Sequence, residues 1–548
     1  MALLVAAALL ALLPESRIAL PVATPDPRVA AGAIHVHSRR SDGSGSIDDI
    51  AAAAAAAGLQ FVVVTDHGDG TRRPDAPRYV SGVLVLDGVE ISSSGGHYLA
   101  LDMPAAPYRL GGEAADVAAD VARLGGLGIV AHPAAPKAEL AWTDWTAPFD
   151  GVEWLNVDSE WRDESWMTLA RAAATYVLRP AESIGVVLDR PRVLATLDQL
   201  AERRDILLLG TTDAHGGVGR EGGRRLRFPS YESAFRALSV RAILRGDLRG
   251  DPTSDSRLIV EALRSRRVFT AIDSIAGPGK LSFAARTSRN DAEMGGRVAP
   301  GVPVTFTAQT NGPAGSTLVL LRDGRQVASA PAPSLEYVAD GSTATYRVEV
   351  RMRQAPGDEP VPWLLSNAIR VGTAPELPPL PAVPASPIRV VLFEPGDRSH
   401  WSAERDPTSH AELSTAAGES PLTLTYSLGT NEAVSPYAAV VRDLPAGLAA
   451  CHTLVLAMSA PSTARVSVQV REPGGSRPVE GRRWHRSVFV DREAQAVTLT
   501  FADLRPAPAA GRPQPDAVAI RTLMVVIDLV NARPGDRGSL RIHRAGCF

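Results

Sequence analysis

The sequence predicts an α/β barrel followed by two all-β domains. Between residues 31 and about 280, strand-like and helix-like segments alternate, and repeated β-then-α units are typical of a barrel. From 281 to 373, apolar residues recur with period two around an Asp323-Gly324 turn, which indicates an immunoglobulin-like β-sandwich. A proline-rich linker over 374–387 then precedes about eight strands in 388–548, which indicate a jelly-roll or galactose-binding-like domain.

The elements of the barrel follow from local patterns. Ser46 is a helix N-cap, Asp49 lies in the first turn and Gly58 ends that helix. Near-continuous apolar residues over 59–67 predict a strand buried on both faces. We expect further strands at 32–38, 83–92, 97–103, 127–133, 151–156, 206–215 and 268–273, and further helices at 113–126, 163–178, 192–205 and 254–267.

Size, charge and the chain start narrow the class of protein. A chain of 548 residues is too long for one core, and a net charge of -3 lacks the basic excess of a nucleic-acid-binding protein. The apolar run Ala2–Leu13 predicts an export signal within residues 1–30, although no Lys or Arg precedes it; the alternative is an apolar N-terminus without that role. We therefore expect a periplasmic or secreted protein without a stable membrane span.

Export would allow Cys451 and Cys547 to form a disulfide, and two free thiols are the alternative.

Nine side chains with metal-binding N or O atoms follow strand-like runs in the first half of the chain. They are His35, His37, Asp42, His67, Glu90, His97, His132, Asp213 and His215. The C-terminal ends of strands are where α/β barrels place their chemistry. A structural zinc needs only four ligands, so nine predict a polynuclear, hydrolytic site for Zn, Mn or Fe. In HxH the two imidazoles share one face of a strand and can bind one cation.

The ordered motifs HxH, SDG, TDH, E, AHP and TDAH resemble those of the PHP (polymerase and histidinol phosphatase) superfamily of metal-dependent phosphoesterases, over residues 32 to about 273. The resemblance implies a distorted (β/α)7 barrel with two or three divalent metal ions. It assigns the first ion to His35, His37, Glu90 and Asp213, with Glu90 bridging to a second ion at His132 and His97. A third ion would lie at Asp42, His67 and His215. Asp42 replaces a histidine of some relatives, which favours Mn or Fe over Zn, and the site is dinuclear if His97 faces the substrate instead.

Clustered cations supply hydroxide from a bound water, so no Ser or Cys nucleophile is required. We expect Glu90, Asp213 and His215 to be catalytic in hydrolysis of phosphate mono- or diesters. A carbamate, amide or carboxylic ester hydrolase stays open, as does an exported binding protein without activity. The predicted partner is a small-molecule or phosphoester substrate rather than nucleic acid, with carbohydrate as a further ligand of the C-terminal domain through Trp401 and Trp484.

Five residues are candidates for supporting roles. Arg220 and Arg224 would bind phosphate, or lie on a solvated basic loop. Trp154, one of five tryptophans between 142 and 166, would line an apolar substrate cleft, or belong to the core. Asp66 would orient a ligand or cap a strand end, and the resemblance gives Glu153 a ligand-orienting role as one of two alternatives.

Overall fold

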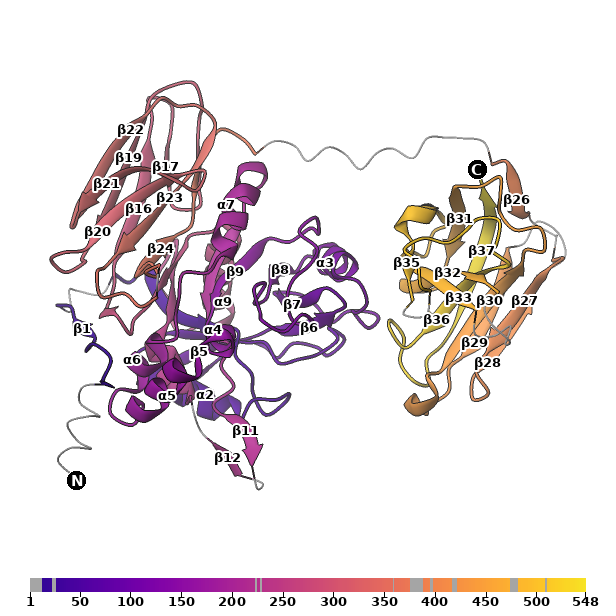
Figure 1. Cartoon of the computed structure of the whole chain (residues 1–548), viewed down its shortest axis with the longest axis horizontal. Coiled ribbons are helices and arrows are strands. Elements are labelled where there is room, and N and C mark those ends of the chain that lie inside the picture. Colours follow the sequence, from indigo (N-terminus) through magenta and orange to yellow (C-terminus); the bar gives the residue numbers. More distant parts are fainter. Residues whose placement is uncertain are drawn as a thin grey trace. The chain divides into compact units, whose positions relative to one another are not determined.

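The computed structural model describes residues 12–21, 26–221, 224–226, 229–357, 359–374, 388–394, 398–415, 421–473, 481–507 and 510–548. The chain divides into two compact units (Figure 1), namely Met1–Pro104 with Val117–Leu377, and Ala105–Asp116 with Pro378–Phe548. Nearly all of the predicted linker, and the apolar run before Leu12, lie outside the described residues. Among the described residues, no helix has the length and apolar character that crossing a membrane requires.

The α/β part of the first unit contains its helices and the strands that carry the candidate ligands. In chain order its elements are β1 (Ile18–Ala19), β2 (Val29–Ile34), α2 (Ile47–Ala56), β3 (Phe61–Val64), β4 (Arg78–Val80), β5 (Val83–Asp87), β6 (Val89–Ser93), β7 (Gly96–Leu101), α3 (Ala114–Arg123), β8 (Leu127–Val130), β9 (Gly151–Asn156), α4 (Val157–Asp163), α5 (Trp166–Thr175), α6 (Pro180–Gly185), α7 (Val193–Arg203), β10 (Leu207–Thr211), β11 (Val218–Glu221), β12 (Arg224–Leu226), α8 (Tyr231–Ala237), β13 (Ser239–Ile243), α9 (Pro252–Arg264), β14 (Val268–Ala271) and β15 (Ala276–Gly277).

Hydrogen bonds place most of these strands in two large sheets, with β1-β15 and β11-β12 as separate two-stranded sheets, so the continuous closed barrel of the prediction is not shown. One sheet contains β13-β2-β3-β5-β4 and the other β10-β9-β8-β7-β6. β7 runs antiparallel to β6 and β8 because the tight turn between β6 and β7 leaves no room for a crossover helix. The two sheets touch through single parallel bridges, Val36 with Ala214 and His67 with Glu90. When these two bridges are counted as pairings, seven strands form a closed ring at one end of the two sheets. They are β2, β3, β6, β7, β8, β9 and β10.

Local sequence signals explain the first β-α unit. Ser46 is the N-cap of α2 as predicted and forms a capping box with Asp49, and Gly58 follows the helix with a φ of 78°. β3 is buried on both faces, as its apolar run predicts. One face of β3 packs in a core with β2, β10 and β13, and the other packs against α2 and α8.

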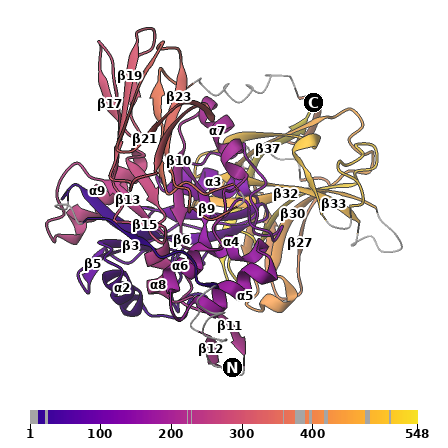
Figure 2. The same cartoon turned by 60° about the vertical axis from the view of Figure 1, so that its left-hand side comes forward.

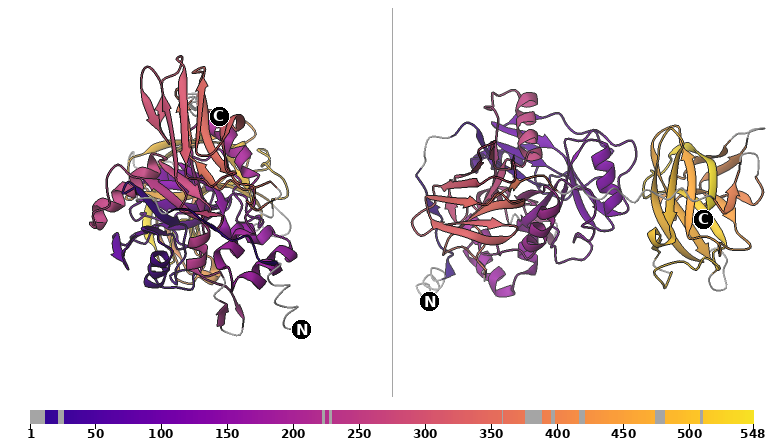
Figure 3. Two further views of the ribbon diagram at one scale, coloured as in Figure 1. Left: turned by 90° about the vertical axis from the view of Figure 1, so that its left-hand side faces the viewer. Right: turned by 90° about the horizontal axis from the view of Figure 1, so that it is seen from above.

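The predicted sandwich of residues 281–373 shares a sheet with the α/β part. β24 pairs with β14 on one side and with β23 on the other, in a twelve-stranded sheet that also contains β2 and β3. Figures 2 and 3 show the sandwich at one end of the first unit, with α2, α5 and α6 at the other end in Figure 2. The strands of the sandwich are β16 (Leu281–Arg286), β17 (Asp291–Glu293), β18 (Arg297–Val298), β19 (Val304–Thr310), β20 (Thr317–Arg322), β21 (Arg325–Pro331), β22 (Ser334–Ala339), β23 (Ala344–Arg351), β24 (Leu364–Ser366) and β25 (Ile369–Val371).

A buried ion-pair network fastens the sandwich to α7. Arg347 on β23 contacts Asp198 of α7 at 2.7 Å and Glu349 at 2.6 Å, and Arg190 contacts Glu349 at 2.7 Å. Burial alone raises the pKa of Glu349, but Arg347, Arg190 and Arg351 outweigh it and hold that pKa well below its usual value. The carboxylate is therefore charged in the folded protein, and its partners stabilise it.

The second unit is a β-sandwich of two six-stranded sheets around one core. The sheets are β28-β29-β37-β31-β34 with β26 on β37, and β27-β30-β36-β32-β33-β35. The expected disulfide between Cys451 and Cys547 is present, with Cα atoms 5.5 Å apart. Trp401 and Trp484, expected to bind carbohydrate, are buried in the core instead because the two sheets close over them. The strands of the second unit are β26 (Val390–Phe393), β27 (Trp401–Arg405), β28 (His410–Ser414), β29 (Leu422–Ser427), β30 (Tyr437–Asp443), β31 (Thr453–Ser459), β32 (Ala464–Glu472), β33 (Arg482–Val490), β34 (Gln495–Thr500), β35 (Arg505–Pro506), β36 (Thr522–Asp528) and β37 (Arg537–Cys547).

Replacement of Glu349 tests this network. We expect Glu349→Ala to lower the free energy of unfolding by about 3–5 kcal/mol, because it leaves buried arginines without their counter-charge. Asp291→Ala is the matched control, since it breaks the exposed Arg286–Asp291 pair and is expected to cost less than about 0.5 kcal/mol. Urea denaturation of both variants measures the difference, and equal costs would contradict a stabilising role for the network.

Candidate metal centre

A single backbone bridge sets four of the nine candidate ligands in register. Val36, just beyond β2, pairs with Ala214, just beyond β10. The amide of His37 donates to the carbonyl of Ala214 at 3.0 Å, and the amide of Ala214 donates to the carbonyl of His35 at 3.2 Å. The bridge residues are flanked by His35 and His37 on one chain segment and by Asp213 and His215 on the other, so all four side chains arrive at one place.

The second bridge places two more ligands. His67, just beyond β3, pairs with Glu90 in β6, and the amide of Gly68 donates to the carbonyl of Glu90 at 3.0 Å. His97 lies opposite Ser92 in the β6–β7 hairpin, close to Glu90, and His132 follows β8. Asp42 reaches the same place from the loop after β2.

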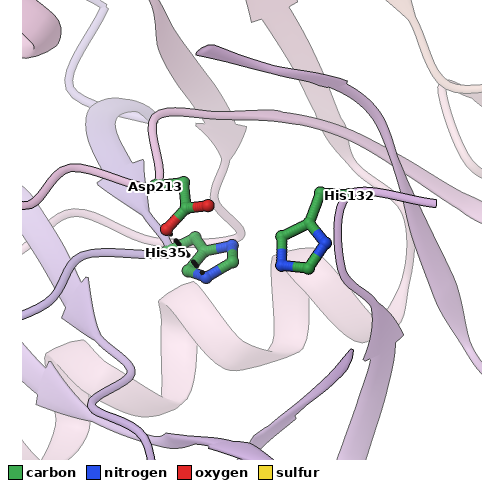
Figure 4. Close-up of side chains that lie close together, drawn as sticks. All are labelled: His35, His132 and Asp213. Carbon is green, nitrogen blue, oxygen red and sulfur yellow. Dashed lines mark ion pairs between the residues drawn. The ribbon is translucent and has the colours of Figure 1, made fainter. Parts of the chain in front are cut away.

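Three candidate ligands have left-handed backbone conformations. The φ angles are 65° at His35, 27° at His132 and 46° at Asp213, the residues drawn in Figure 4. Such a conformation costs about 1–3 kcal/mol in a residue with a side chain, and it persists where the surroundings enforce it. His35 therefore does not continue the strand, contrary to the geometry expected for HxH. The two imidazoles converge because β2 ends at Ile34 and the chain turns.

Glu90 is the centre of the cluster. This buried carboxylate has one oxygen, Oε2, at 3.2 Å from His35 Nε2, 3.1 Å from His37 Nε2 and 3.3 Å from His67 Nδ1. Its other oxygen, Oε1, lies 3.0 Å from His132 Nε2 and 2.7 Å from His97 Nδ1. The two oxygens therefore face two different sets of histidines, as a bridging carboxylate would.

Asp213 and Asp42 complete the cluster at two depths. Asp213 Oδ1 lies 3.2 Å from His35 Nε2 and 3.1 Å from His37 Nε2, all buried. Asp42 Oδ2 lies 3.2 Å from His215 Nε2 and 3.6 Å from His67 Nε2. The side chains of Asp42, His67 and His215 are 51%, 34% and 20% exposed, so this group forms the solvent side of the site.

The proton positions leave lone pairs facing one another. Nδ1 of His35 lies 2.7 Å from Oε1 of Glu153, which only accepts when ionised, so Nδ1 carries the proton and donates. In the neutral ring Nε2 then points its lone pair at the oxygens of Glu90 and Asp213. The buried atoms His35 Nε2, His37 Nε2, His132 Nδ1 and Asp213 Oδ1 make no hydrogen bond within the described part of the chain.

A cation bound by the histidine nitrogens and carboxylate oxygens would satisfy these atoms, and N and O donors of this kind suit Zn, Mn or Fe. Five sets of three side chains have ligand atoms within 4.8 Å of one another. They are His35-His132-Asp213, His35-His37-Glu90, His37-Asp213-His215, His37-Asp42-His67 and His67-Glu90-His97. All nine predicted ligands occur in these sets, so the residues fit a site for more than one metal ion.

The pKa shifts describe the same electrostatic balance without metal. Burial lowers the pKa of His35, but the charges of Asp213, Glu153 and Glu90 outweigh it and raise that pKa well above its usual value. Burial also lowers the pKa of His37, but the interactions with Asp213 and Glu90 outweigh burial and raise that pKa to about 10. Without metal, protons therefore take the place of cations in the cluster.

Three further residues hold the ligands in place. Glu153 accepts from Nδ1 of His35 through one oxygen, and from the amide of His132 through the other at 2.7 Å. Asp66 accepts from the amide and hydroxyl of Ser38, and so orders the loop before Asp42 rather than bonding a ligand ring. Tyr231 donates to the carbonyl of His37 at 2.7 Å, a role that no motif in the sequence indicates.

The structure tests the role of one of the three candidate substrate residues. Trp154 is 1% exposed, and its indole donates to Thr270 Oγ1 at 2.9 Å, so it belongs to the core and does not line a cleft. The reason is that β9 is buried along its whole length. Arg220 and Arg224 lie in β11 and β12, and their side chains fall outside the described part of the structure.

Comparison with known proteins identifies no family for the chain. No family model and no curated protein matches it. Among solved structures, a two-domain protein from Bacteroides vulgatus containing a predicted PHP-like metal-dependent phosphoesterase is 14% identical, with 66% of this chain and 99% of that chain covered and a TM-score of 0.29. The family 11 carbohydrate-binding module from Clostridium thermocellum, in complex with a β-1,3-1,4-mixed-linked tetrasaccharide, is 12% identical, with coverage of 29% and 94% and a TM-score of 0.25.

Glu153→Gln tests the positioning role. An amide accepts through only one atom, so one of the bonds to His35 and His132 is lost, and we expect metal affinity to fall by about 10–100-fold. Competition with a fluorescent chelator measures the affinity. Glu139→Gln, at an exposed position, is the control and should leave it unchanged. An unchanged affinity in Glu153→Gln would contradict the role.

Proposed function

We propose that the chain is a metal-dependent hydrolase of phosphoesters. The observation that supports the proposal most directly is the convergence of buried atoms that make no hydrogen bond among the described residues: His35 Nε2 and His37 Nε2 lie 3.2 Å and 3.1 Å from Asp213 Oδ1. Buried polar atoms are almost always hydrogen-bonded in native proteins, so this convergence favours a cationic partner. A purely structural site would use about four ligands, whereas nine converge here.

In this proposal the inner residues His35, His37, Glu90 and Asp213 would hold one ion, and His132 and His97, together with Glu90, would hold a second. Asp42, His67 and His215 would hold a third ion on the solvent side. Bound ions of this kind supply hydroxide from water at neutral pH and offset charge on a phosphoryl oxygen. Asp42 in this set favours Mn or Fe over Zn, as the family resemblance implies.

The chain's own residues prepare this chemistry. Glu153 fixes the tautomer of His35, so that Nε2 is free to bind. Nδ1 of His215 donates to the carbonyl of Asp213 at 2.8 Å, which likewise directs its Nε2 toward Asp42. The partly exposed side of Asp42, His67 and His215 is the side from which a substrate reaches the cluster. Glu90, Asp213 and His215 remain the residues to which we assign catalytic roles.

Phosphoesters are kept as the substrate class because the motifs resemble those of metal-dependent phosphoesterases. Trp142 and Trp154 are buried and do not line an apolar substrate cleft, whereas Trp166 is exposed. We also propose that the protein is exported, since the Cys451–Cys547 disulfide is typical of oxidising compartments.

His35→Ala and Asp213→Ala test the function. The parent protein is expected to carry two or three ions per chain by mass spectrometry and to hydrolyse p-nitrophenyl phosphate or its bis-ester with added Mn. Each variant should lose turnover by more than about a hundredfold, because removal of a direct ligand exceeds the effect of losing its hydrogen-bond partner. His410→Ala, exposed in the second unit, is the control.

Two outcomes would redirect the proposal. Bound metal with turnover of carbamates or carboxylic esters but not phosphoesters would replace the substrate class. Less than one ion per chain after reconstitution, with no turnover, would leave a binding protein.

A further inference from the structure

Asn156 is a buried amide beside the candidate metal centre. It is the last residue of β9 and the N-cap of α4, and it is 3% exposed. Its Oδ1 accepts from the amide of Ser159 at 3.0 Å, as an N-cap residue does. Because only the oxygen of a side-chain amide accepts, this bond fixes the orientation of the group and leaves Nδ2 to donate elsewhere.

The nitrogen of this amide meets three acceptors next to the candidate ligands. Nδ2 donates to Glu153 Oε2 at 2.8 Å, and longer contacts of 3.4 Å and 3.5 Å join it to Thr211 Oγ1 and Asp213 Oδ2. The parallel pairing of β9 with β10 produces this arrangement, because it sets Asn156 opposite Thr211, two residues before Asp213. One amide therefore reaches Glu153 on its own strand and Asp213 beyond the neighbouring strand.

Asn156 completes the hydrogen bonds of Glu153. Oε1 of Glu153 lies 2.7 Å from His35 Nδ1, and Oε2 accepts from the amide of His132 at 2.7 Å as well as from Asn156. Both oxygens are thus held, and the carboxylate cannot turn without breaking one of these bonds. Since Glu153 holds His35 and His132, the positions of these two candidate ligands depend on Asn156 as well.

The same amide distinguishes the two oxygens of Asp213. Oδ2 faces Asn156, whereas Oδ1 lies 3.2 Å from His35 Nε2 and 3.1 Å from His37 Nε2, and Figure 4 shows the contact with His35. Oδ1 makes no hydrogen bond within the described part of the chain. Asp213 is therefore directed toward the histidines through one oxygen, while the amide contacts the other.

We propose that Asn156 is a positioning residue of the metal centre, which directs Oδ1 of Asp213 toward a bound ion and holds Glu153 against His35 and His132. The proposal rests on the metal centre of the proposed function, but not on the reaction that the ions support. Groups that hold metal ligands in this way change metal affinity by about 10–100-fold when they are removed.

A simpler role for Asn156, as the cap of α4 alone, predicts a different result. A residue that only caps the helix can be replaced by any other capping side chain, whereas the positioning role requires the two N–H groups of the amide. Serine and threonine cap helices through a hydroxyl oxygen, and they add no charge. With one donor hydrogen on a shorter side chain, they do not replace the bonds to both Glu153 and Asp213.

Asn156→Ser and Asn156→Thr test the proposal with cobalt(II), an ion that N and O ligands bind and whose visible absorption reports their arrangement. We expect both variants of the full chain to bind cobalt at least about tenfold more weakly, with an altered visible spectrum, because Glu153 and Asp213 lose their donor. Titration with cobalt chloride against a chelator measures affinity and spectrum together. Ser165→Ala is the control: it removes the N-cap of α5, where Ser165 accepts from the amide of Thr168 at 3.2 Å, and should change neither.

Urea denaturation establishes that each variant is folded under the assay conditions. Cobalt affinity and spectrum like those of the parent in both variants would overturn the proposal, and so would a parent chain that binds no cobalt. A response to Asn156 in a chain without phosphoester turnover would support this proposal and reject the proposed function. Turnover with cobalt binding that ignores Asn156 would do the reverse.

Discussion

Two single backbone bridges are the constraint on which the candidate metal centre depends. One joins Val36 to Ala214 and the other His67 to Glu90, and each is flanked by or includes ligand-type side chains. Together they set six of the nine candidate ligands in register, namely His35, His37, Asp213, His215, His67 and Glu90. The remaining strands of the two sheets pack through side chains without ladder pairing, so the backbone ring closes only at the candidate ligands.

The metal-free protein carries unfavourable contributions at this site. Left-handed backbone at His35, His132 and Asp213 opposes folding, and protons on His35 and His37 offset the charge of the buried carboxylates. The helices α2 and α8 and the hydrophobic core enforce the geometry from outside. Cations would take the place of these protons, so metal binding, proton release and the stability of this region are thermodynamically linked.

Much of the candidate site can be predicted from the sequence because ligand types and strand ends are recognisable in short segments. The nine candidate ligands, the capped helix α2 and the buried strand β3 follow from short patterns. The bridges, the positive φ angles and the bond from Tyr231 to His37 arise from contacts between distant segments, which no local pattern records. Trp154 illustrates the limit: a cluster of tryptophans indicates burial against something, and the sequence does not distinguish a substrate from a core.

The pairing of β14 with β24 determines where the chain can be divided. β14 has β13 on its other side, so removal of residues 281–373 would uncover a row of unpaired amide and carbonyl groups along a buried strand. Such an edge invites pairing with other chains. A fragment that ends at about residue 280 would therefore tend to aggregate. The smallest unit suited to crystallisation or engineering extends through β25, and we expect the α/β part and the sandwich to unfold together.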